Sequence, residues 1–135
     1  MTQVWERLFI GGIADAEELA DDNPDGITAV ISLSEVAVRT RREDVKYVHL
    51  PIEDDKPVPI RQFYCIMDAI RKNIRWGTVL LHCGVGLSRA PSFAAAWMAA
   101  VGYKNIDSAI EEIRQLRPVI DPSKILLKSV RENLG

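Results

Sequence analysis

The sequence predicts an α/β fold in which a mainly parallel central sheet is flanked by helices. Short apolar runs rich in β-branched residues, of which Ile27 to Leu33 is the clearest, are typical of strands buried in a parallel sheet. Longer segments such as Ile60 to Arg75 place apolar residues three and four positions apart, which indicates amphipathic helices. A short loop joins the strand Thr78 to Leu81 to a buried helix, Ala90 to Val101, as expected in such folds.

Length and composition are those of a globular domain. A chain of 135 residues, 47% hydrophobic and 27% charged, is expected to form one domain, residues 1–135, with a sizeable core. No apolar run approaches the roughly 18 residues of a membrane span, and the first residues lack a signal-peptide pattern. The formal charge of −2 gives no reason to expect nucleic acid as a partner. We therefore expect a cytoplasmic monomer that binds neither a membrane nor nucleic acid.

The beginning of the chain alternates between strand and helix. Trp5 to Ile10 indicates a first strand that ends at Gly11-Gly12, and Ala14 to Ala20 indicates a short acidic helix. An Asp25-Gly26 turn then leads into the strand Ile27 to Leu33.

The polar segment from Ser34 to Asp44 allows two interpretations. It carries Arg39, Arg41 and Arg42, which form either an ordinary solvated loop or a basic rim beside a ligand site. The second interpretation rests on the fact that loops at the carboxyl ends of parallel strands surround the ligand in α/β folds. Tyr47 to Leu50 follows as another strand.

A proline-rich loop separates this strand from the first long helix. Pro51 to Pro59 combines prolines with acidic residues and must be irregular, whereas Ile60 to Arg75 is amphipathic and is expected to pack on the sheet. Cys65 in this helix is expected to be a small buried thiol. Trp76 and Trp97 are expected in the core.

Two further helices complete the chain. Ile106 to Arg117 repeats the amphipathic spacing of the earlier helix. The last helix is expected to begin with Asp121 as its N-cap and Pro122 in its first position.

The loop from His82 to Arg89 has the composition of an anion-binding site. Backbone N–H groups at the start of a helix lack intrahelical partners, and the helix dipole favours negative charge there. Gly84 and Gly86 permit a tight turn, and the guanidinium of Arg89 can donate to two oxygens of one phosphate. The expected phosphate-binding residues are Gly84, Val85, Gly86, Leu87, Ser88 and Arg89.

Cys83 lies at the base of this loop and is the expected nucleophile. The helix terminus and the guanidinium that attract phosphate also stabilise a thiolate. A thiolate can attack phosphorus in line to give a cysteinyl-phosphate, which water then hydrolyses, so neither a metal nor a cofactor is expected. With only Cys65 besides, the chain also has too few cysteines for a Cys-based zinc site. His82 is expected to orient the loop through hydrogen bonds.

The departing oxygen needs a proton, and a positioned carboxylic acid contributes about 10² to 10⁴ in rate. The Pro51 to Pro59 loop supplies Glu53, Asp54 and Asp55. Asp54 is the preferred general acid and Asp55 the alternative.

The chain resembles the dual-specificity branch of the cysteine-dependent protein tyrosine phosphatases. Their signature of His-Cys, five residues and Arg is present as His82, Cys83 and Arg89. The segments Leu8 to Ala16 and Leu50 to Asp54 also resemble the opening strand and the general-acid loop of that family. Arg117-Pro118 before a last helix fits as well, and alignment on Ile60 puts Asp54 at the acid position. The resemblance implies a protein tyrosine phosphatase-like fold and phosphorylated proteins as substrates, phosphotyrosine first, then phosphoserine and phosphothreonine.

Ala90 departs from the usual pattern of that family. Most members carry Ser or Thr after the signature arginine, where the hydroxyl assists departure of the thiolate from the phosphoenzyme. The phosphatases of regenerating liver share Arg-Ala-Pro at this place and turn over slowly, so we expect hydrolysis of the intermediate to limit the rate.

The same residues are compatible with other functions. Relatives hydrolyse phosphoinositides, phosphorylated glycans or RNA 5′-phosphates. A phosphate-dependent binding module with little turnover is the alternative from a different class, which Ala90 favours and Cys83 disfavours. A sulfur-transfer or arsenate-reducing enzyme is weaker, because arsenate reductases of this chemistry commonly use further cysteines and only Cys65 is available.

Overall fold

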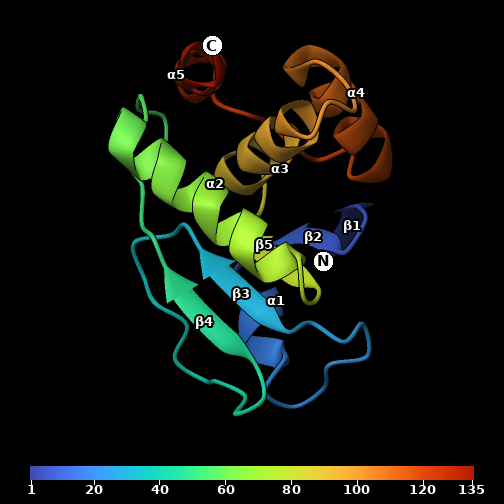
Figure 1. Ribbon diagram of the computed structural model, residues 1–135. Coiled ribbons are helices and arrows are strands. Elements are labelled where there is room, and N and C mark those ends of the chain that lie inside the picture. Colours follow the sequence, from blue (N-terminus) through green and yellow to red (C-terminus); the bar gives the residue numbers. More distant parts are fainter.

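A computed structural model describes residues 1–135 and contains a five-stranded sheet in the order β1-β2-β5-β3-β4 (Figure 1). The strands are β1 (Thr2–Trp5), β2 (Leu8–Gly11), β3 (Ala29–Ser32), β4 (Lys46–His49) and β5 (Val79–His82). The pairs β2–β5, β5–β3 and β3–β4 are parallel, and only the edge strand β1 is antiparallel to its neighbour. The mainly parallel sheet expected from the sequence is therefore confirmed.

Helices cover both faces of the sheet. They are α1 (Ile13–Glu18), α2 (Ile60–Ile74), α3 (Arg89–Ala100), α4 (Ile106–Leu116) and α5 (Lys124–Leu134). The larger core lies between one face and helices α2 to α5, and the smaller core lies between the other face and α1 with the segment that follows β3 (Figure 1).

The central strand β5 contributes side chains to both cores. Val79 and Leu81 belong to the larger core, whereas Leu80 between them belongs to the smaller one. Side chains alternate along a strand, so a strand covered on both faces needs a continuous apolar run. Because β5 is the central strand, the loop that follows it lies at the middle of the carboxyl edge of the sheet.

The first strand was predicted wrongly. Trp5 to Ile10 is not one strand, because the chain reverses at Glu6-Arg7 to form the antiparallel pair β1–β2. Arg7 has a φ of 56°, in the left-handed region that favours glycine. No Gly, Pro, Asn or Asp marks this turn, so the usual sequence signals were missing.

The start of the last helix was also predicted wrongly. Ser123, not Asp121, is the N-cap of α5, since its side chain accepts a hydrogen bond from the Leu126 N–H. Asp121 instead donates its backbone N–H to the Leu87 carbonyl at 2.7 Å. The chain therefore stays extended through Pro122 alongside the loop between β5 and α3 before the helix begins.

Two side chains expected inside the protein lie at its surface. Cys65 is exposed, because the buried stripe of α2 runs through Phe63, Ile66, Ile70 and Ile74 and leaves position 65 outside. Trp76 is 81% exposed, just beyond the end of the helix.

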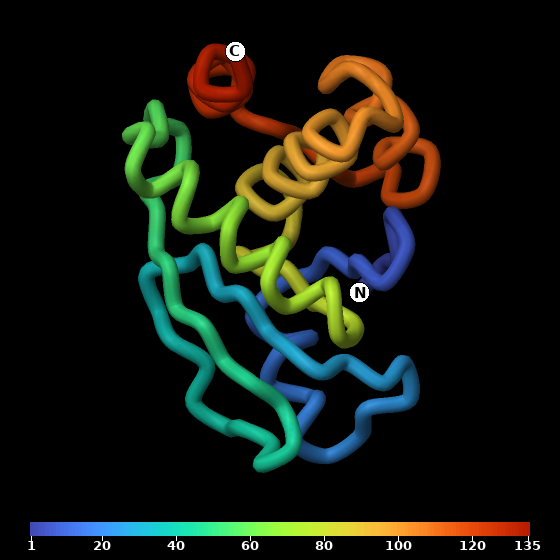
Figure 2. Tube along the Cα trace, viewed as in Figure 1, coloured from blue at the N-terminus to red at the C-terminus, as the bar shows by residue number.

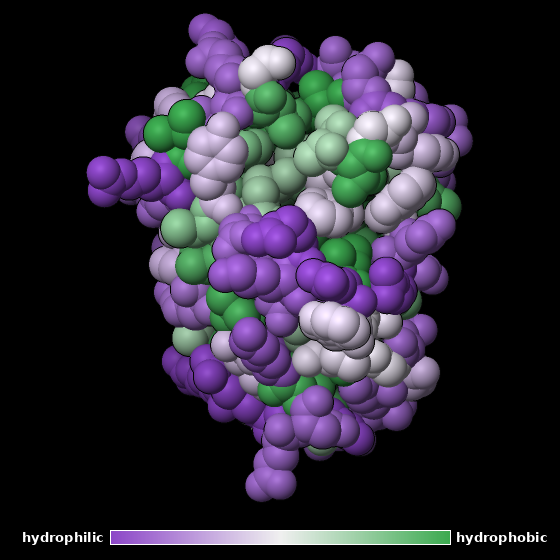
Figure 3. Space-filling view, viewed as in Figure 1, coloured by the Kyte–Doolittle hydropathy of each residue, from purple (hydrophilic) through white to green (hydrophobic).

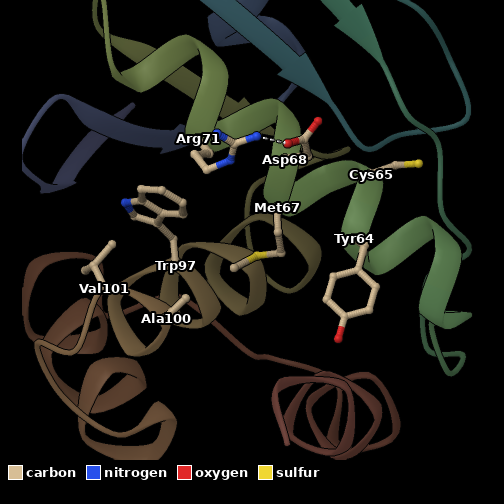
Figure 4. A pocket seen from close by; sticks show the side chains of 8 residues that line it. All are labelled: Tyr64, Cys65, Met67, Asp68, Arg71, Trp97, Ala100 and Val101. Atoms are coloured by element: carbon tan, nitrogen blue, oxygen red, sulfur yellow. Dashed lines mark hydrogen bonds and ion pairs between the residues drawn. The ribbon is translucent and has the colours of Figure 1, made fainter.

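Trp97 is half-buried and lines a groove between α2 and α3 (Figure 4). The groove has a volume of about 710 Å³, and Tyr64, Met67 and Val101 also line it. Apolar side chains gather over the helices on this face of the molecule (Figure 3).

Candidate active site

The loop between β5 and α3 turns its carbonyl groups outward. The carbonyl of Gly84 accepts a hydrogen bond from the Ile13 N–H at 2.9 Å, and that of Leu87 accepts from the Asp121 N–H at 2.7 Å. The guanidinium of Arg117 donates to the carbonyls of Val85 and Gly86, at 3.3 and 3.2 Å.

Outward carbonyls imply inward N–H groups. In a planar trans peptide the C=O of one residue and the N–H of the next point in opposite directions. The N–H groups of residues 85 to 88 therefore face the hollow of the loop, and none of them donates to another group of the protein. Together with the start of α3 they form a cradle for an anion.

Two glycines allow this loop to pack closely against the turn after β2. Gly86 has a φ of +74°, and a Cβ there would lie 2.7 Å from the Gly11 carbonyl oxygen. A Cβ on Gly12 would lie 2.8 Å from the Gly84 carbonyl oxygen. The sequence indicated a strand end at Gly11-Gly12, but not that this backbone supports the cradle.

Cys83 lies at the base of the cradle and is buried, with 3% of its surface exposed. Its Sγ accepts a hydrogen bond from the Ala90 N–H in the first turn of α3, at 3.5 Å. The N-terminal end of α3 is therefore directed at the sulfur atom.

Arg89 is held from behind by acceptors on two other loops. Its Nη1 donates to the Ile52 carbonyl and to Glu35 Oε1, both at 3.0 Å, and to the Leu33 carbonyl at 3.4 Å. Its Nη2 lies near Gly84, 3.6 Å from where a Cβ on that residue would be. One edge of the guanidinium is therefore tethered, and Nη2 remains beside the cradle.

Glu35 was not found from the sequence. Hydrogen bonds from its own backbone N–H and from the Arg89 side chain keep the pKa of Glu35 below its usual value. Its place on the loop after β3 was the only available signal, because loops at this edge of the sheet surround the site.

His82 orients the loop, in line with its expected role. Its Nδ1 lies 3.1 Å from the Cys83 carbonyl, and its Nε2 lies 2.6 Å from Ser32 Oγ. Burial lowers the pKa of His82, so the ring is neutral near pH 7. Because a carbonyl can only accept, Nδ1 carries the proton and Nε2 accepts from the Ser32 hydroxyl.

Asp54 is the acid-loop carboxylate that reaches the cradle. A cavity of about 290 Å³ is lined by Asp54, Cys83, Gly84, Val85, Leu87, Ser88, Arg89 and Asp121. Asp55 does not line it, because its Oδ1 accepts a hydrogen bond from Ser123 Oγ at 2.8 Å. Glu53 lines a different cavity together with Glu35. Asp121 was missed as a site residue, since the sequence suggested a helix cap.

The arginines of the Ser34 to Asp44 segment do not line this cavity. Glu17 accepts hydrogen bonds from the backbone N–H groups of Arg39 and Thr40. Arg42 donates to the Leu19 carbonyl, and Arg41 lies over the Tyr47 ring. These contacts agree with the solvated-loop interpretation, and none of the three arginines lines the cavity that contains Cys83.

No group of three or more His, Cys, Asp or Glu side chains is arranged to hold a metal ion. None of the helices has the length and apolar character needed to cross a lipid bilayer.

Comparison with known proteins identifies the family. A profile described as dual specificity phosphatase, catalytic domain, matches residues 8–133. The chain belongs to this family. Dual specificity protein phosphatase 15 of Homo sapiens is 28% identical over 122 residues, which cover 89% of this chain and 41% of that protein. Dual specificity protein phosphatase 18 of Rattus norvegicus is 29% identical over 128 residues, which cover 91% of this chain and 61% of that protein.

The dual-specificity phosphatase domain thus spans less than two thirds of the length of these relatives. The crystal structure of DUSP15 superposes with a TM-score of 0.85 at 26% identity, covering 99% of this chain and 86% of that one. The crystal structure of human DUSP28 gives a TM-score of 0.86 at 19% identity, covering 99% and 95%. The phosphatase-like fold expected from the sequence is confirmed.

Proposed function

We propose that this dual-specificity phosphatase domain hydrolyses phosphate monoesters on proteins, phosphotyrosine first and then phosphoserine and phosphothreonine, through a cysteinyl-phosphate. One observation carries the proposal. A single cavity brings together Cys83, the phosphate-binding loop, Arg89 and the carboxyl group of Asp54, the one residue of the acid loop that lines it. These are the parts that covalent phosphoryl transfer requires.

In the first step, the Cys83 thiolate attacks the phosphorus atom and the bond from phosphorus to the ester oxygen breaks. Negative charge on the equatorial oxygens is stabilised by the N–H groups of residues 85 to 88 and by Arg89. Asp54 donates its proton to the departing oxygen, which leaves as a phenol or an alcohol.

In the second step, water attacks phosphorus, the bond to sulfur breaks and inorganic phosphate is released. Asp54, now a carboxylate, accepts the proton of the water. The departing sulfur accepts a hydrogen bond from the Ala90 backbone N–H, but the Ala90 side chain offers no hydroxyl.

Charge around the cradle favours phosphoproteins over substrates with several phosphates. Asp54 and Asp121 line the cradle, and Asp55 and Lys124 line the adjacent cavity with them. Apart from Arg89, which is assigned to the reacting phosphate, Lys124 is the only cation that lines the two cavities. The additional charges of a phosphoinositide or of an RNA 5′-phosphate would therefore lie against carboxylates. A peptide carrying a single phosphate avoids that repulsion.

The test is hydrolysis of p-nitrophenyl phosphate with EDTA present, by wild type, Cys83→Ser and Asp54→Ala across pH. We expect metal-independent activity that Cys83→Ser abolishes, and a basic limb of the pH profile that Asp54→Ala removes. If Asp54→Ala leaves the basic limb of the pH profile unchanged, Asp55 would be the general acid. Wild type that binds phosphotyrosine peptide but turns over nothing would instead support the phosphate-dependent binding module.

A further inference from the structure

We propose that Ser123 is a positioning residue for the general acid, and that it holds the tip of the acid loop over the phosphate cradle through Asp55. The inference rests on the proposed function, because it concerns how Asp54 is presented to the departing oxygen. Ser123 touches neither substrate nor nucleophile in this scheme.

Ser123 joins three parts of the site. Its hydroxyl donates to Asp55 Oδ1 at 2.8 Å and accepts from the Leu126 N–H at 3.2 Å. Its backbone N–H donates to Ser88 Oγ in the phosphate loop at 2.8 Å. A serine hydroxyl has one hydrogen and two lone pairs, so the side chain can satisfy both of its partners at once.

The hydrogen bond to Asp55 is the only one that holds the tip of the acid loop. Ile52 is fixed because its N–H donates to the Leu33 carbonyl and its carbonyl accepts from Arg89, and Val58 is fixed by Ser129 of α5. Between them, residues 53 to 57 make no other hydrogen bond or ion pair with the protein. The position of the tip therefore depends on Ser123.

Helix α5 provides a firm base for this contact. Ser129 Oγ accepts a hydrogen bond from the Val58 N–H at 2.9 Å, and Asn133 Nδ2 donates to the Val58 carbonyl at 3.1 Å. Figure 2 shows the start of the green segment before α2 beside the red terminal helix. The acid loop is thus attached to α5 at its far end by Ser129 and Asn133, and at its tip by Ser123.

The backbone at Asp55 separates the two carboxylates. Asp55 has a φ of 55°, a left-handed conformation that Asp tolerates better than most residues. Asp55 points to Ser123, whereas Asp54 lines the cavity that contains Cys83. Releasing Asp55 would free this turn and with it the carboxyl group of Asp54.

Substrates that differ in their need for an acid test the proposal. Phenyl phosphate releases a strong base, with a conjugate acid of pKa about 10, whereas p-nitrophenyl phosphate releases a much weaker one. We expect Ser123→Ala to reduce kcat/KM on phenyl phosphate by about tenfold or more, a part of the 10²-fold or larger effect of an acid. Its kcat/KM on p-nitrophenyl phosphate should fall by less than about threefold. We compare kcat/KM because it reports the step in which the ester oxygen departs, even when breakdown of the phosphoenzyme limits kcat.

Two further variants separate the contact with Asp55 from the helix cap. Ser123→Asp keeps an N-cap acceptor for Leu126 but places a carboxylate against Asp55. We expect it to lose at least as much activity on phenyl phosphate as Ser123→Ala while the helix stays capped. Ser123→Thr keeps the hydroxyl and should restore wild-type selectivity. Asn105→Ala removes the corresponding cap of α4, far from the site, and should leave both rates unchanged.

Variants of Asp55 test the other partner without touching α5. Asp55→Asn keeps an acceptor for the Ser123 hydroxyl and should retain the wild-type selectivity, whereas Asp55→Ala should behave like Ser123→Ala. The proposal would be overturned if Ser123→Ala lost activity equally on both substrates. It would also be overturned if Ser123→Asp hydrolysed phenyl phosphate at the wild-type rate.

The failure of this proposal can be told from failure of the proposed function. If Asp54→Asn selectively loses activity on phenyl phosphate and Ser123→Ala does not, Asp54 is still the general acid but Ser123 does not position it. If Asp55→Asn loses as much activity on phenyl phosphate as Asp54→Asn, the general acid has been assigned to the wrong carboxylate, and the proposed role of Ser123 is wrong as well. Wild type without activity on either ester would overturn both.

Discussion

The Nη1 atom of Arg89 lies 3.0 Å from Oε1 of Glu35, on the side of the guanidinium held by the Ile52 and Leu33 carbonyls. Arg89 is buried, while the Glu35 side chain is 61% exposed. The negatively charged partner of this buried arginine therefore lies on a loop at the protein surface.

Removal of this partner should weaken substrate binding. Glu35→Ala is expected to lower kcat/KM about threefold to tenfold, mainly through KM, because two backbone carbonyls still hold Arg89 but its charged partner is gone. Glu53→Ala is the matched control, since it removes a neighbouring acid that does not contact Arg89. Equal effects of both changes would mean that only the charge of the region matters.

The ion pair between Arg89 and Glu35 should also persist in mild acid. The pKa of Glu35 is lowered by its own backbone N–H and by Arg89, so its contribution is present above the usual Glu value of about 4.3. That contribution is lost only as pH falls through the lower value of the folded protein. Between pH 6 and 5, the ratio of kcat/KM for wild type and Glu35→Ala should therefore stay constant.

Ala90 should make breakdown of the phosphoenzyme slow. Rapid mixing of wild type with p-nitrophenyl phosphate is expected to release a burst of nitrophenol close to one equivalent, followed by a slower steady state. Ala90→Ser adds a hydroxyl in the first turn of α3 and should raise the steady-state rate about tenfold while shrinking the burst. Ala94→Ser, one turn further along the same buried helix, is the control. Linear release with no gain from Ala90→Ser would contradict this account.

Arg117 should determine the shape of the cradle from outside. Its guanidinium donates to the carbonyls of Val85 and Gly86 and to Thr2 Oγ1, which keeps the following N–H groups turned inward. Arg117→Met retains the apolar stem but loses these donors, so inhibition by inorganic phosphate should weaken about tenfold. Arg114→Met, on the exposed side of the same helix, should bind phosphate like wild type. Unchanged phosphate inhibition of Arg117→Met would show that the loop keeps its shape without the guanidinium.

His82 should make the protein less stable in mild acid. Burial lowers the pKa of His82, so the unfolded chain takes up its proton more readily than the folded one. The stabilisation is complete above the unfolded value of about 6.5 and is lost as pH falls below it.

Urea unfolding at pH 7.5 and at pH 5.5 measures this effect. His82→Asn should be less stable than wild type at pH 7.5 but should lose less stability between the two pH values. His49→Asn leaves His82 in place and is the comparison. A wild-type pH dependence that persists in His82→Asn would assign it to other groups.

Local patterns predicted most of the helices and strands. The apolar stripe of α2 and the strand–loop–helix arrangement around Cys83 depend on neighbours within a few positions, so the sequence alone reveals them. The β1–β2 turn failed because Glu6-Arg7 carries no turn residue. Asp121 and Ser123 are both good N-caps, and only the contact between Asp121 and Leu87, from elsewhere in the chain, decides between them.

Contacts between distant positions explain what the sequence missed at the site. Glu35 meets Arg89 across 54 positions, and Asp55 meets Ser123 across 68. Neither pair has a local spacing that could reveal it, because each depends on which loops the parallel strands bring to one edge of the sheet. The cysteine, the arginine and the preferred carboxylate could be proposed from the sequence, but the residues that hold them could not.

The outward carbonyls of the phosphate loop have a consequence for how the protein acquires activity. Their donors come from Ile13 near the beginning of the chain and from Arg117 and Asp121 near its end, and Arg117 also reaches Thr2 across 115 positions. A partly folded chain cannot assemble these partners, so catalysis should appear only in the last cooperative step of folding. Recovery of activity during refolding would then report completion of the whole molecule rather than formation of its local structure.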